Sequence, residues 1–207
     1  MLNIFFPARD ASGIAISLVM FQLARHPEVY AQVRAEVSEK GLKDGITYEA
    51  LKNLRYVNAV INETLRLHGP TGHALRDVLS DAVLPRGGGP DGHQPMFVPR
   101  GSAVVVHMHA LQRNYAAWGD DADSFRPERW LEDAKASQRR GWEYLPFLGG
   151  PRICPGQPMV LAQLAYIIVA FADRFREIQS CDPEERLIEE HRILMKIRNG
   201  VLVKLVP

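Results

Sequence analysis

The chain has 207 residues, 46% of them apolar and 24% charged, a composition typical of a soluble globular protein that buries a sizeable core. A formal net charge of +1 gives no reason to expect nucleic acid or an acidic substrate as a partner. Two cysteines exclude a disulfide framework and favour a reducing compartment. The longest apolar windows, residues 13–24 and 159–172, are too short to span a bilayer, and no signal peptide or anchor is visible.

Three helices are predicted in the first third of the chain, over residues 2–25, 27–39 and 56–67. Apolar residues recur at three- and four-residue spacing in the first, which indicates an amphipathic helix. Pro27 suits the first position of the second helix, which Gly41 stops. Thr47 is predicted to cap a short turn before the third.

A polar interruption, residues 7–12, lies inside the first predicted helix. Pro7 frees a backbone carbonyl there, which predicts a kink. Asp10 and Ser12 line this kink and could pass protons or water. The alternative is a kinked core helix on which Arg9 and Asp10 are simply solvated.

On the third predicted helix, Glu63 and Arg66 stand three residues apart, a spacing that brings side chains together on one helix face. The pair could lock to each other. A bare Glu-x-x-Arg is weak support for a function, because such pairs are more often solvated.

Short β-prone runs follow and predict one small sheet, interrupted by a glycine-rich loop over residues 87–92. The runs are residues 75–78, 82–84, 96–98 and 103–107. His107 and His109 would share a strand face and could be imagined with Cys154 as a zinc site. No Cys-x-x-Cys or His-x-x-x-His spacing supports that alternative.

The second half of the chain alternates polar and apolar segments. We expect a polar turn with a short helix over residues 113–123 and a charged irregular stretch over residues 131–142. A long apolar helix is predicted over residues 159–173, and strand regions over residues 176–180 and 192–206. Asn199-Gly200 is a strong hairpin signal and predicts that the last strand region folds back on itself there. Arg139 and Arg140 form either a docking face for an acidic partner or a solvated pair.

A glycine-rich loop delivers Cys154 to the start of the long apolar helix. Pro155 suits a first helical position, which places Cys154 at the N-cap, where free amides and the helix dipole favour a thiolate. Such a thiolate is a metal ligand or a nucleophile, and no histidine base lies within the loop. Gly149 and Gly150 allow a tight turn or close approach to something flat, and Arg152 can reach an anionic group.

The pattern Phe-x-x-Gly-x-Arg-x-Cys-x-Gly over residues 147–156 resembles the haem-binding loop of the cytochrome P450 monooxygenases. The interrupted first helix, the Glu-x-x-Arg pair and residues 125–130 resemble three further motifs of that family in the same order, with Trp130 in place of a phenylalanine. The resemblance implies a fold that is mainly α with small β-sheets. It also implies that residues 1–207 form a partial cytochrome P450 domain, truncated on its N-terminal side.

The resemblance implies a role for each matching residue. Cys154 would be the thiolate ligand of the iron of haem b, and Asp10 and Ser12 would deliver protons. The other expected haem-binding residues are Phe147, Gly150, Arg152, Gly156 and Arg76, with Arg152 and Arg76 on the propionates. A buried structural network behind the haem would consist of Glu63, Arg66 and Arg129. The sequence departs from the family at Ala11, which stands where the family has a threonine.

The implied function is insertion of one oxygen atom from O₂ into an apolar small molecule, with electrons from an NADPH-dependent reductase. Residues 84–89 and 149–154 further resemble fungal microsomal enzymes that hydroxylate alkanes and fatty acids. The expected location is the cytosolic face of the endoplasmic reticulum for a full-length member, attached through an N-terminal anchor that is missing here, and the cytosol for this chain. The alternative is a non-catalytic fragment that keeps the motifs but cannot assemble a site.

Overall fold

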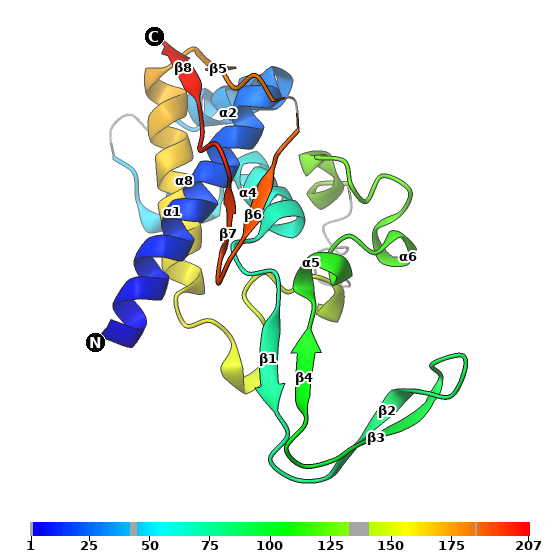
Figure 1. The fold of residues 1–207 in the computed structure, drawn as a ribbon. Coiled ribbons are helices and arrows are strands. Elements are labelled where there is room, and N and C mark those ends of the chain that lie inside the picture. The colour runs from blue at the N-terminus through cyan, green and yellow to red at the C-terminus, as the bar shows by residue number, and fades with distance from the viewer. Residues whose placement is uncertain (1, 42–44, 133–140, 185) are drawn as a thin grey trace.

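The computed structural model describes residues 2–41, 45–132, 141–184 and 186–207. These residues form a mainly α fold with small antiparallel sheets, as predicted (Figure 1). The helices are α1 (Leu2–Arg25), α2 (Pro27–Glu39), α3 (Tyr48–Lys52), α4 (Arg55–His68), α5 (Met108–Leu111), α6 (Tyr115–Trp118) and α8 (Gln157–Arg174), with short 3₁₀ helices η2 (Pro127–Trp130), η3 (Gly141–Glu143) and η4 (Gly150–Arg152). The strands are β1 (Ala74–Asp77), β2 (Ala82–Gly88), β3 (Gln94–Val98), β4 (Ala103–Val106), β5 (Glu177–Ser180), β6 (Glu189–His191), β7 (Met195–Ile197) and β8 (Val203–Val206).

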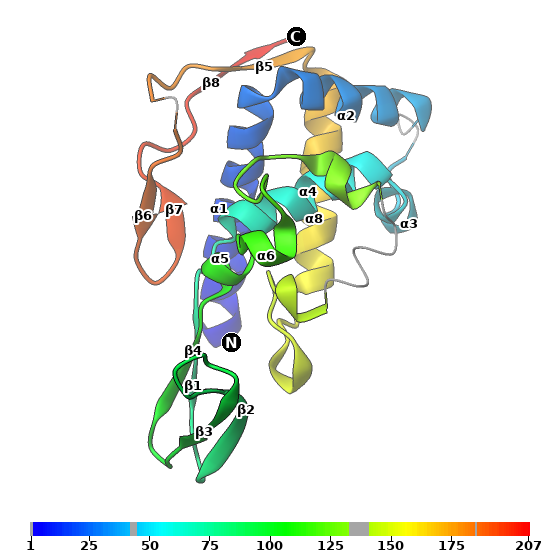
Figure 2. The same cartoon turned by 90° about the vertical axis from the view of Figure 1, so that its right-hand side faces the viewer.

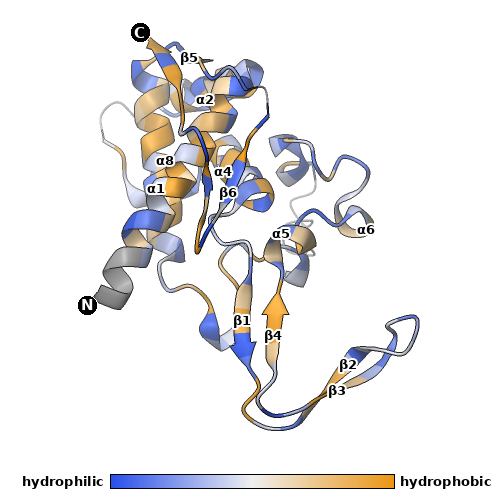
Figure 3. Cartoon of the chain, viewed as in Figure 1, coloured by the Kyte–Doolittle hydropathy of each residue, from blue (hydrophilic) through white to orange (hydrophobic). Residues whose placement is uncertain are grey.

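The core lies where the long helices meet. Figures 1 and 2 show α1 and α8 side by side, α4 crossing them, and α2 across one end. Hydrophobic residues predominate along α8 and the adjoining part of α1 (Figure 3). Among the most buried apolar side chains of these helices are Val19, Leu23, Val33, Val57, Ile61, Leu164 and Ile168. Burial of one such side chain contributes roughly 1.5–3 kcal/mol, so this packing holds α8 firmly against the other helices.

Helix α1 has the predicted bounds and continues through Pro7, but the predicted amphipathic pattern does not extend over its C-terminal part. Every residue from Leu18 to Ala24 is buried. A helix that is buried all round is surrounded by protein, and α1 packs against α2, α4, α8, β5 and β7. The three- and four-residue spacing therefore underestimated how deeply this helix lies in the core.

The ends of the shorter helices are held by side chains. Thr47 caps α3, as predicted, because its hydroxyl oxygen accepts a 3.1 Å hydrogen bond from the N–H of Ala50. The first turn of α4 is capped by a residue that is distant in the sequence. Carboxylate oxygens of Glu36, on α2, accept hydrogen bonds from the N–H groups of Tyr56 at 3.0 Å and Val57 at 2.9 Å. This contact joins α2 to the start of α4 and stabilises the positive end of the α4 dipole.

The strands form separate two-stranded ladders in the described residues, and the prediction of one small sheet over residues 75–107 is wrong. β1 pairs with β4, whereas β2 pairs with β3 in a hairpin that projects from the body (Figures 1 and 2). Pro99 lies between the two ladders and has no N–H to donate, and Gly101 has a positive φ of 85°. Both features interrupt the continuous pairing that one sheet would need.

The predicted hairpin at Asn199-Gly200 is also wrong. β7 pairs with β6 through a turn at residues 192–194, and β8 pairs with β5 instead of β7. Asn199-Gly200 is a turn, with a φ of 72° at Gly200, that carries the chain from one ladder to the other. The dipeptide therefore predicted a change of direction but not the strand partners, which the buried residues Ile178, Met195 and Ile197 fix by packing.

The histidines considered for zinc do not share a strand face. β4 ends at Val106, and His107 caps α5 by accepting a 3.2 Å hydrogen bond from the N–H of Ala110 through Nδ1. His109 lies inside α5, where residues two apart point in different directions. Across the part of the chain that the structure describes, no group of three or more His, Cys, Asp or Glu residues could hold a metal ion.

Candidate active site

The loop that carries Cys154 precedes α8 instead of capping it. Helix α8 begins at Gln157 with Gly156 at the N-cap, so the prediction that Cys154 occupies that position is wrong. Gln157 is the first helical residue and Pro158 the second, so the proline of the first turn is Pro158 and Pro155 lies before the helix. The N–H of Gln157 donates to the carbonyl oxygen of Cys154 at 3.4 Å, which extends the turn backward to the cysteine. Cys154 therefore lies in a turn just outside the helix, and it is exposed.

Hydrogen bonds close the Cys154 loop on itself. The N–H of Cys154 donates to the carbonyl oxygen of Phe147 at 2.9 Å, and the N–H of Ile153 donates to that of Gly150 at 3.1 Å. Leu148 has a φ of 62° and Gly150 a φ of 70°, both in the left-handed region. Glycine adopts that region easily, whereas Leu148 is held there at a cost by its surroundings. The loop is therefore a tight turn whose geometry is imposed by its contacts.

Each loop glycine serves one of the two purposes predicted, a close approach to a flat group at Gly149 and a tight turn at Gly150, although the flat group in the structure is the ring of Trp142. A Cβ at Gly149 would lie 2.8 Å from the ring of Trp142, so Gly149 makes room for that side chain. Gly150 is required by its positive φ, and a Cβ there would meet nothing within 4 Å. A Cβ at Gly156 would lie 3.8 Å from the Sγ atom of Cys154, so a small residue at this position keeps one side of the sulfur open.

The predicted anion-binding side chains are exposed. No hydrogen bond or ion pair joins the guanidinium group of Arg152 to another residue in the described ranges. Arg76 lies on β1, and its Nη1 donates to the carbonyl oxygen of its neighbour Leu75 at 2.9 Å. The Cys154 loop, the N-terminal end of α1 and strand β1 all lie at the same end of the helical body (Figures 1 and 2).

This end of the molecule also exposes apolar side chains. Leu75 and Val105 face each other across β1 and β4 and are both exposed. Ile153, next to Cys154, and Met159, in the first turn of α8, are exposed as well. Phe147 is half-buried and packs against the core beneath the loop. A thiol, cationic groups and apolar surface therefore meet at one end, which fits a large apolar group with anionic substituents.

The structure does not bring Asp10 and Ser12 together. Asp10 is exposed, whereas Ser12 is 7% exposed and faces a groove of about 360 Å³ between α1 and α8. Tyr166 and Gln163 line the α8 side of this groove. The hydroxyl of Ser12 is buried and forms no hydrogen bond with the residues described. No hydrogen bond joins either residue to the Cys154 loop within those residues.

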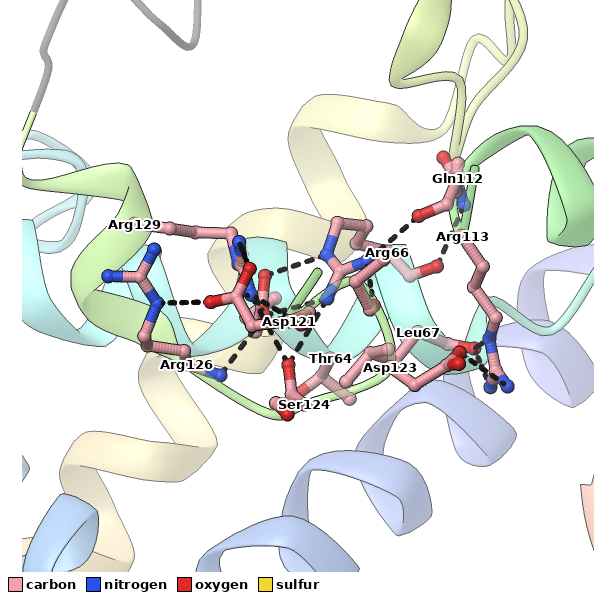
Figure 4. A network of polar contacts seen from close by, with 12 residues as sticks. Thr64, Arg66, Leu67, Gln112, Arg113, Asp121, Asp123, Ser124, Arg126 and Arg129 are labelled. Atoms are coloured by element: carbon pink, nitrogen blue, oxygen red, sulfur yellow. Dashed lines mark hydrogen bonds and ion pairs between the residues drawn. The ribbon is translucent and has the colours of Figure 1, made fainter. Parts of the chain in front are cut away.

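Glu63, Arg66 and Arg129 do come together in a buried cluster, of which Figure 4 labels the two arginines. The carboxylate of Glu63 accepts hydrogen bonds of 2.9 Å from both Nε and Nη2 of Arg66 and of 2.8 Å from Nε of Arg129. The indole N–H of Trp130 donates to the same carboxylate at 2.9 Å, and the backbone N–H of Arg126 at 3.1 Å. Two buried arginines thus share one buried carboxylate, and this cluster joins α4 to η2.

Each arginine has further partners. Nη1 of Arg66 donates to the carbonyl oxygens of Gln112 at 2.8 Å and Ala122 at 2.7 Å, and its guanidinium lies 4.7 Å from the ring centre of Trp118. Arg129 donates to the carboxylate of Asp121 at 3.2 and 3.1 Å. Burial alone would raise the pKa of Asp121, but the hydrogen bonds and charges of its arginine partners outweigh burial and leave that pKa below its ordinary value. The cluster is therefore an extended network, largely of charge-assisted bonds.

A second polar cluster, which the sequence did not predict, joins the C-terminal end of α4 to β6. Nδ1 of His68 and Oε1 of Glu189 lie 2.8 Å apart, and Arg113 donates to the carbonyl oxygen of Leu67 at 3.1 and 2.6 Å. Burial lowers the pKa of His68, and Glu189 only partly offsets this effect. For Glu189, burial raises the pKa, but the hydrogen bond from His68 and the charges of His109, His68 and Arg113 hold it below its ordinary value. Sequence separation hid this contact, since Glu189 looks like an ordinary surface glutamate.

Comparison with known proteins identifies the family. The family model described as Cytochrome P450 matches residues 1–204. The chain belongs to the cytochrome P450 family. Similar curated proteins include Cytochrome P450 monooxygenase fsdH of Fusarium heterosporum, 42% identical over 205 residues, and Cytochrome P450 monooxygenase himC of Aspergillus japonicus, 41% identical over 205 residues. Cytochrome P450 52A3-A of Candida maltosa is 42% identical over 188 residues.

The alignments cover almost all of this cytochrome P450 chain but only part of each relative. They include 99%, 99% and 88% of the chain, but 35%, 36% and 36% of the three relatives. The chain therefore spans about a third of the length of the curated relatives it matches. No helix in the described part of the chain is both long enough and apolar enough to cross a membrane. Arg139 and Arg140, the predicted docking face, lie outside the described residues.

Proposed function

We propose that this chain forms the haem-thiolate part of a monooxygenase that inserts one oxygen atom from O₂ into an apolar substrate, with alkanes and fatty acids as the substrate class. The observation that carries the proposal is the exposed Cys154, held in a closed turn immediately before α8 in a chain of the cytochrome P450 family. The subclass rests on the resemblance of residues 84–89 and 149–154 to fungal microsomal enzymes that hydroxylate alkanes and fatty acids.

Haem b, iron protoporphyrin IX, is the cofactor that these residues suit. Cys154 would bind the iron, and Phe147, Gly150 and Gly156 would shape the surface beside the sulfur. Arg152 and Arg76 would hold the propionates, a role supported by their exposure and by the absence of an ion pair to either within the described ranges. When bound, the haem supplies the chemistry that activates O₂.

The protein residues supply support and protons. We assign the buried network of Glu63, Arg66 and Arg129 a structural role, because Arg66 and Arg129 are both buried and direct their guanidinium groups to protein oxygens. Asp10 and Ser12 are proposed to deliver protons toward the O₂-binding side. The support for Ser12 is its buried hydroxyl, which forms no hydrogen bond with the residues described and remains available to a water or a ligand. Ala11 has no hydroxyl, so it cannot take part in such a relay.

The proposed partners are an NADPH-dependent reductase as electron donor, O₂ and an apolar small molecule. We place the reaction at the cytosolic face of the endoplasmic reticulum, by the resemblance to microsomal enzymes. The docking role of Arg139 and Arg140 stays a prediction.

The experiment that tests the function uses a chimera in which these residues replace the matching segment of Cytochrome P450 52A3-A. The chimera is supplied with reductase, NADPH, ¹⁸O₂ and either a long-chain alkane or a fatty acid. We expect a hydroxylated product that carries one ¹⁸O atom. A chimera that binds haem and consumes O₂ but forms no labelled product from either substrate would contradict the substrate class.

A second candidate, a non-catalytic fragment, is favoured by the apolar side chains that stay uncovered around the site. Ile153, Met159 and Tyr166 are exposed, although a haem must be enclosed by protein on both faces to exclude water. This candidate predicts that the 207-residue chain alone binds less than one equivalent of haem, binds hydrophobic dyes and self-associates. A monomer that holds one haem tightly would exclude it.

A further inference from the structure

Gln112 is the buried C-cap residue of α5, and its side chain connects two parts of the molecule. Only 2% of the residue is exposed. Its Nε2 donates to the carbonyl oxygens of Leu65 at 3.3 Å and Arg66 at 3.2 Å, in the last turn of α4. Its Oε1 accepts a 2.8 Å hydrogen bond from the backbone N–H of Leu145. Both ends of one amide are therefore used, one on α4 and the other on the segment that leads into the Cys154 loop.

The same residue also contacts the charged network directly. The carbonyl oxygen of Gln112 accepts a 2.8 Å hydrogen bond from Nη1 of Arg66, and Figure 4 shows the two residues side by side. Gln112 thus lies between the guanidinium of Arg66, which the carboxylate of Glu63 fixes, and Leu145. A displacement of Gln112 would shift both Arg66 and Leu145, because the interior around it is closely packed.

Leu145 begins a short series of backbone contacts that ends at the cysteine. The carbonyl oxygen of Leu145 accepts a 3.2 Å hydrogen bond from the N–H of Leu148, and the carbonyl oxygen of Phe147 accepts the 2.9 Å bond from the N–H of Cys154. Leu148 has a φ of 62°, a conformation that a leucine keeps only where its surroundings impose it. The turn that imposes it starts at Leu145, whose own N–H is fixed by Gln112.

We propose that Gln112 is a positioning residue that fixes the Cys154 loop relative to α4. This inference rests on the proposed function, in which Cys154 binds the haem iron. Gln112 does not touch the reacting atoms and acts through Leu145 and the turn at Leu148. The competing interpretation is that Gln112 only satisfies the last carbonyl groups of α4, which would stabilise the helix without any effect on the loop.

Two substitutions separate these interpretations. Gln112→Met keeps a side chain of similar length but removes the donor toward α4 and the acceptor toward Leu145. Gln112→Glu keeps an acceptor for Leu145 and replaces the donor toward α4 by an oxygen that faces the two carbonyl oxygens of Leu65 and Arg66. The matched control is Thr64→Val, since Thr64 is buried on α4 and its hydroxyl donates to the carbonyl oxygen of Val60 in the same helix.

The first measurement is amide hydrogen exchange on the 207-residue chain without haem. In Gln112→Met we expect exchange of the amides from Leu145 to Cys154 to rise about tenfold or more, since the part-buried N–H of Leu145 loses its acceptor, while amides of α8 change little. Gln112→Glu and Thr64→Val should leave the loop within about threefold of the unchanged chain. Unchanged loop exchange in Gln112→Met would overturn the proposal, as would an equal rise across α1, α4 and α8.

The second measurement is the reduced, CO-bound absorption spectrum of the chimera. Gln112→Met should lower the fraction of bound haem that shows a thiolate spectrum, and Gln112→Glu should restore it. A full thiolate fraction in Gln112→Met would overturn the positioning role. If the unchanged chimera binds no haem, the proposed function fails, and the exchange measurement still decides whether Gln112 holds the loop.

Discussion

Replacing Glu63 by glutamine tests the buried network with the smallest change of shape. Glu63 is fully buried and accepts hydrogen bonds from Arg66, Arg129 and Trp130. Glutamine keeps the length of the side chain but removes the negative charge. It also turns one acceptor into an N–H₂ group, which would face the N–H donors of the arginines.

The expected loss of stability depends on which arginine is left without a carboxylate partner. Arg129 keeps the carboxylate of Asp121, at 3.2 and 3.1 Å, in the Glu63→Gln variant. Arg66 keeps only carbonyl oxygens and the ring of Trp118 among the described residues, so its buried charge is left uncompensated. Removing one partner of a buried ion pair costs about 3–5 kcal/mol. A domain has about 5–15 kcal/mol of stability in total, so the variant should be strongly destabilised.

The assay is urea unfolding of the 207-residue chain at pH 7, followed by circular dichroism. The matched control is Glu132→Gln, because Glu132 pairs with Arg126 at 2.8 Å but its side chain is 60% exposed. An exposed ion pair contributes about 1 kcal/mol or less, so this variant should unfold close to the unchanged chain.

A decrease of less than about 1 kcal/mol in the free energy of unfolding of Glu63→Gln would refute the reasoning, because leaving a buried guanidinium group without its carboxylate should destabilise the fold by more than that. Equal losses in the two variants would refute it as well, since burial would then make no difference to the value of an ion pair.

Further predictions concern the same network and the His68 cluster. Trp130→Phe removes the N–H that donates to Glu63 at 2.9 Å, and should lower the free energy of unfolding by about 1–3 kcal/mol in the same urea assay; an unchanged midpoint would mean that the indole contributes only its ring. The pKa values of His68 and Glu189 in the folded chain both lie below their ordinary values of 6.5 and 4.5. Their contribution to the free energy of unfolding is therefore complete above pH 6.5, and it is lost as the pH falls through each folded-state pKa. The urea midpoint should therefore drop between pH 7 and pH 4, and it should drop less in His68→Asn between pH 7 and pH 5; equal drops would argue against His68 as the titrating group.

Local sequence signals predicted the helices well because the residues that begin and end them act on neighbouring backbone. Thr47 caps α3 through its own hydroxyl, and Pro27 opens α2, as the sequence indicated. Two prolines near the start of α8 were ambiguous, however. Pro155 and Pro158 both suit a first turn, and the structure uses Pro158, which moves Cys154 out of the cap.

Contacts between distant segments were harder to predict. Asn199-Gly200 marked a turn, but pairing of β5 with β8 depends on how both strands pack on the helices. The sequence placed Glu63, Arg66 and Arg129 in one network only through the family motifs, since sequence separation alone says nothing about contact. Gln112 gave no signal at all, because a glutamine in a polar stretch usually faces solvent. Its burial becomes visible only when α4 and Leu145 are seen on either side of it.

The measurement that tests the central claim most directly is the reduced, CO-bound absorption spectrum of the chimera after replacing each cysteine in turn. Cys154 and Cys181 are both exposed thiols, so Cys181→Ser is a matched control for Cys154→Ser. We predict that Cys154→Ser abolishes the thiolate spectrum and that Cys181→Ser leaves it intact. A thiolate spectrum that survives Cys154→Ser and disappears in Cys181→Ser would contradict the placement of the site.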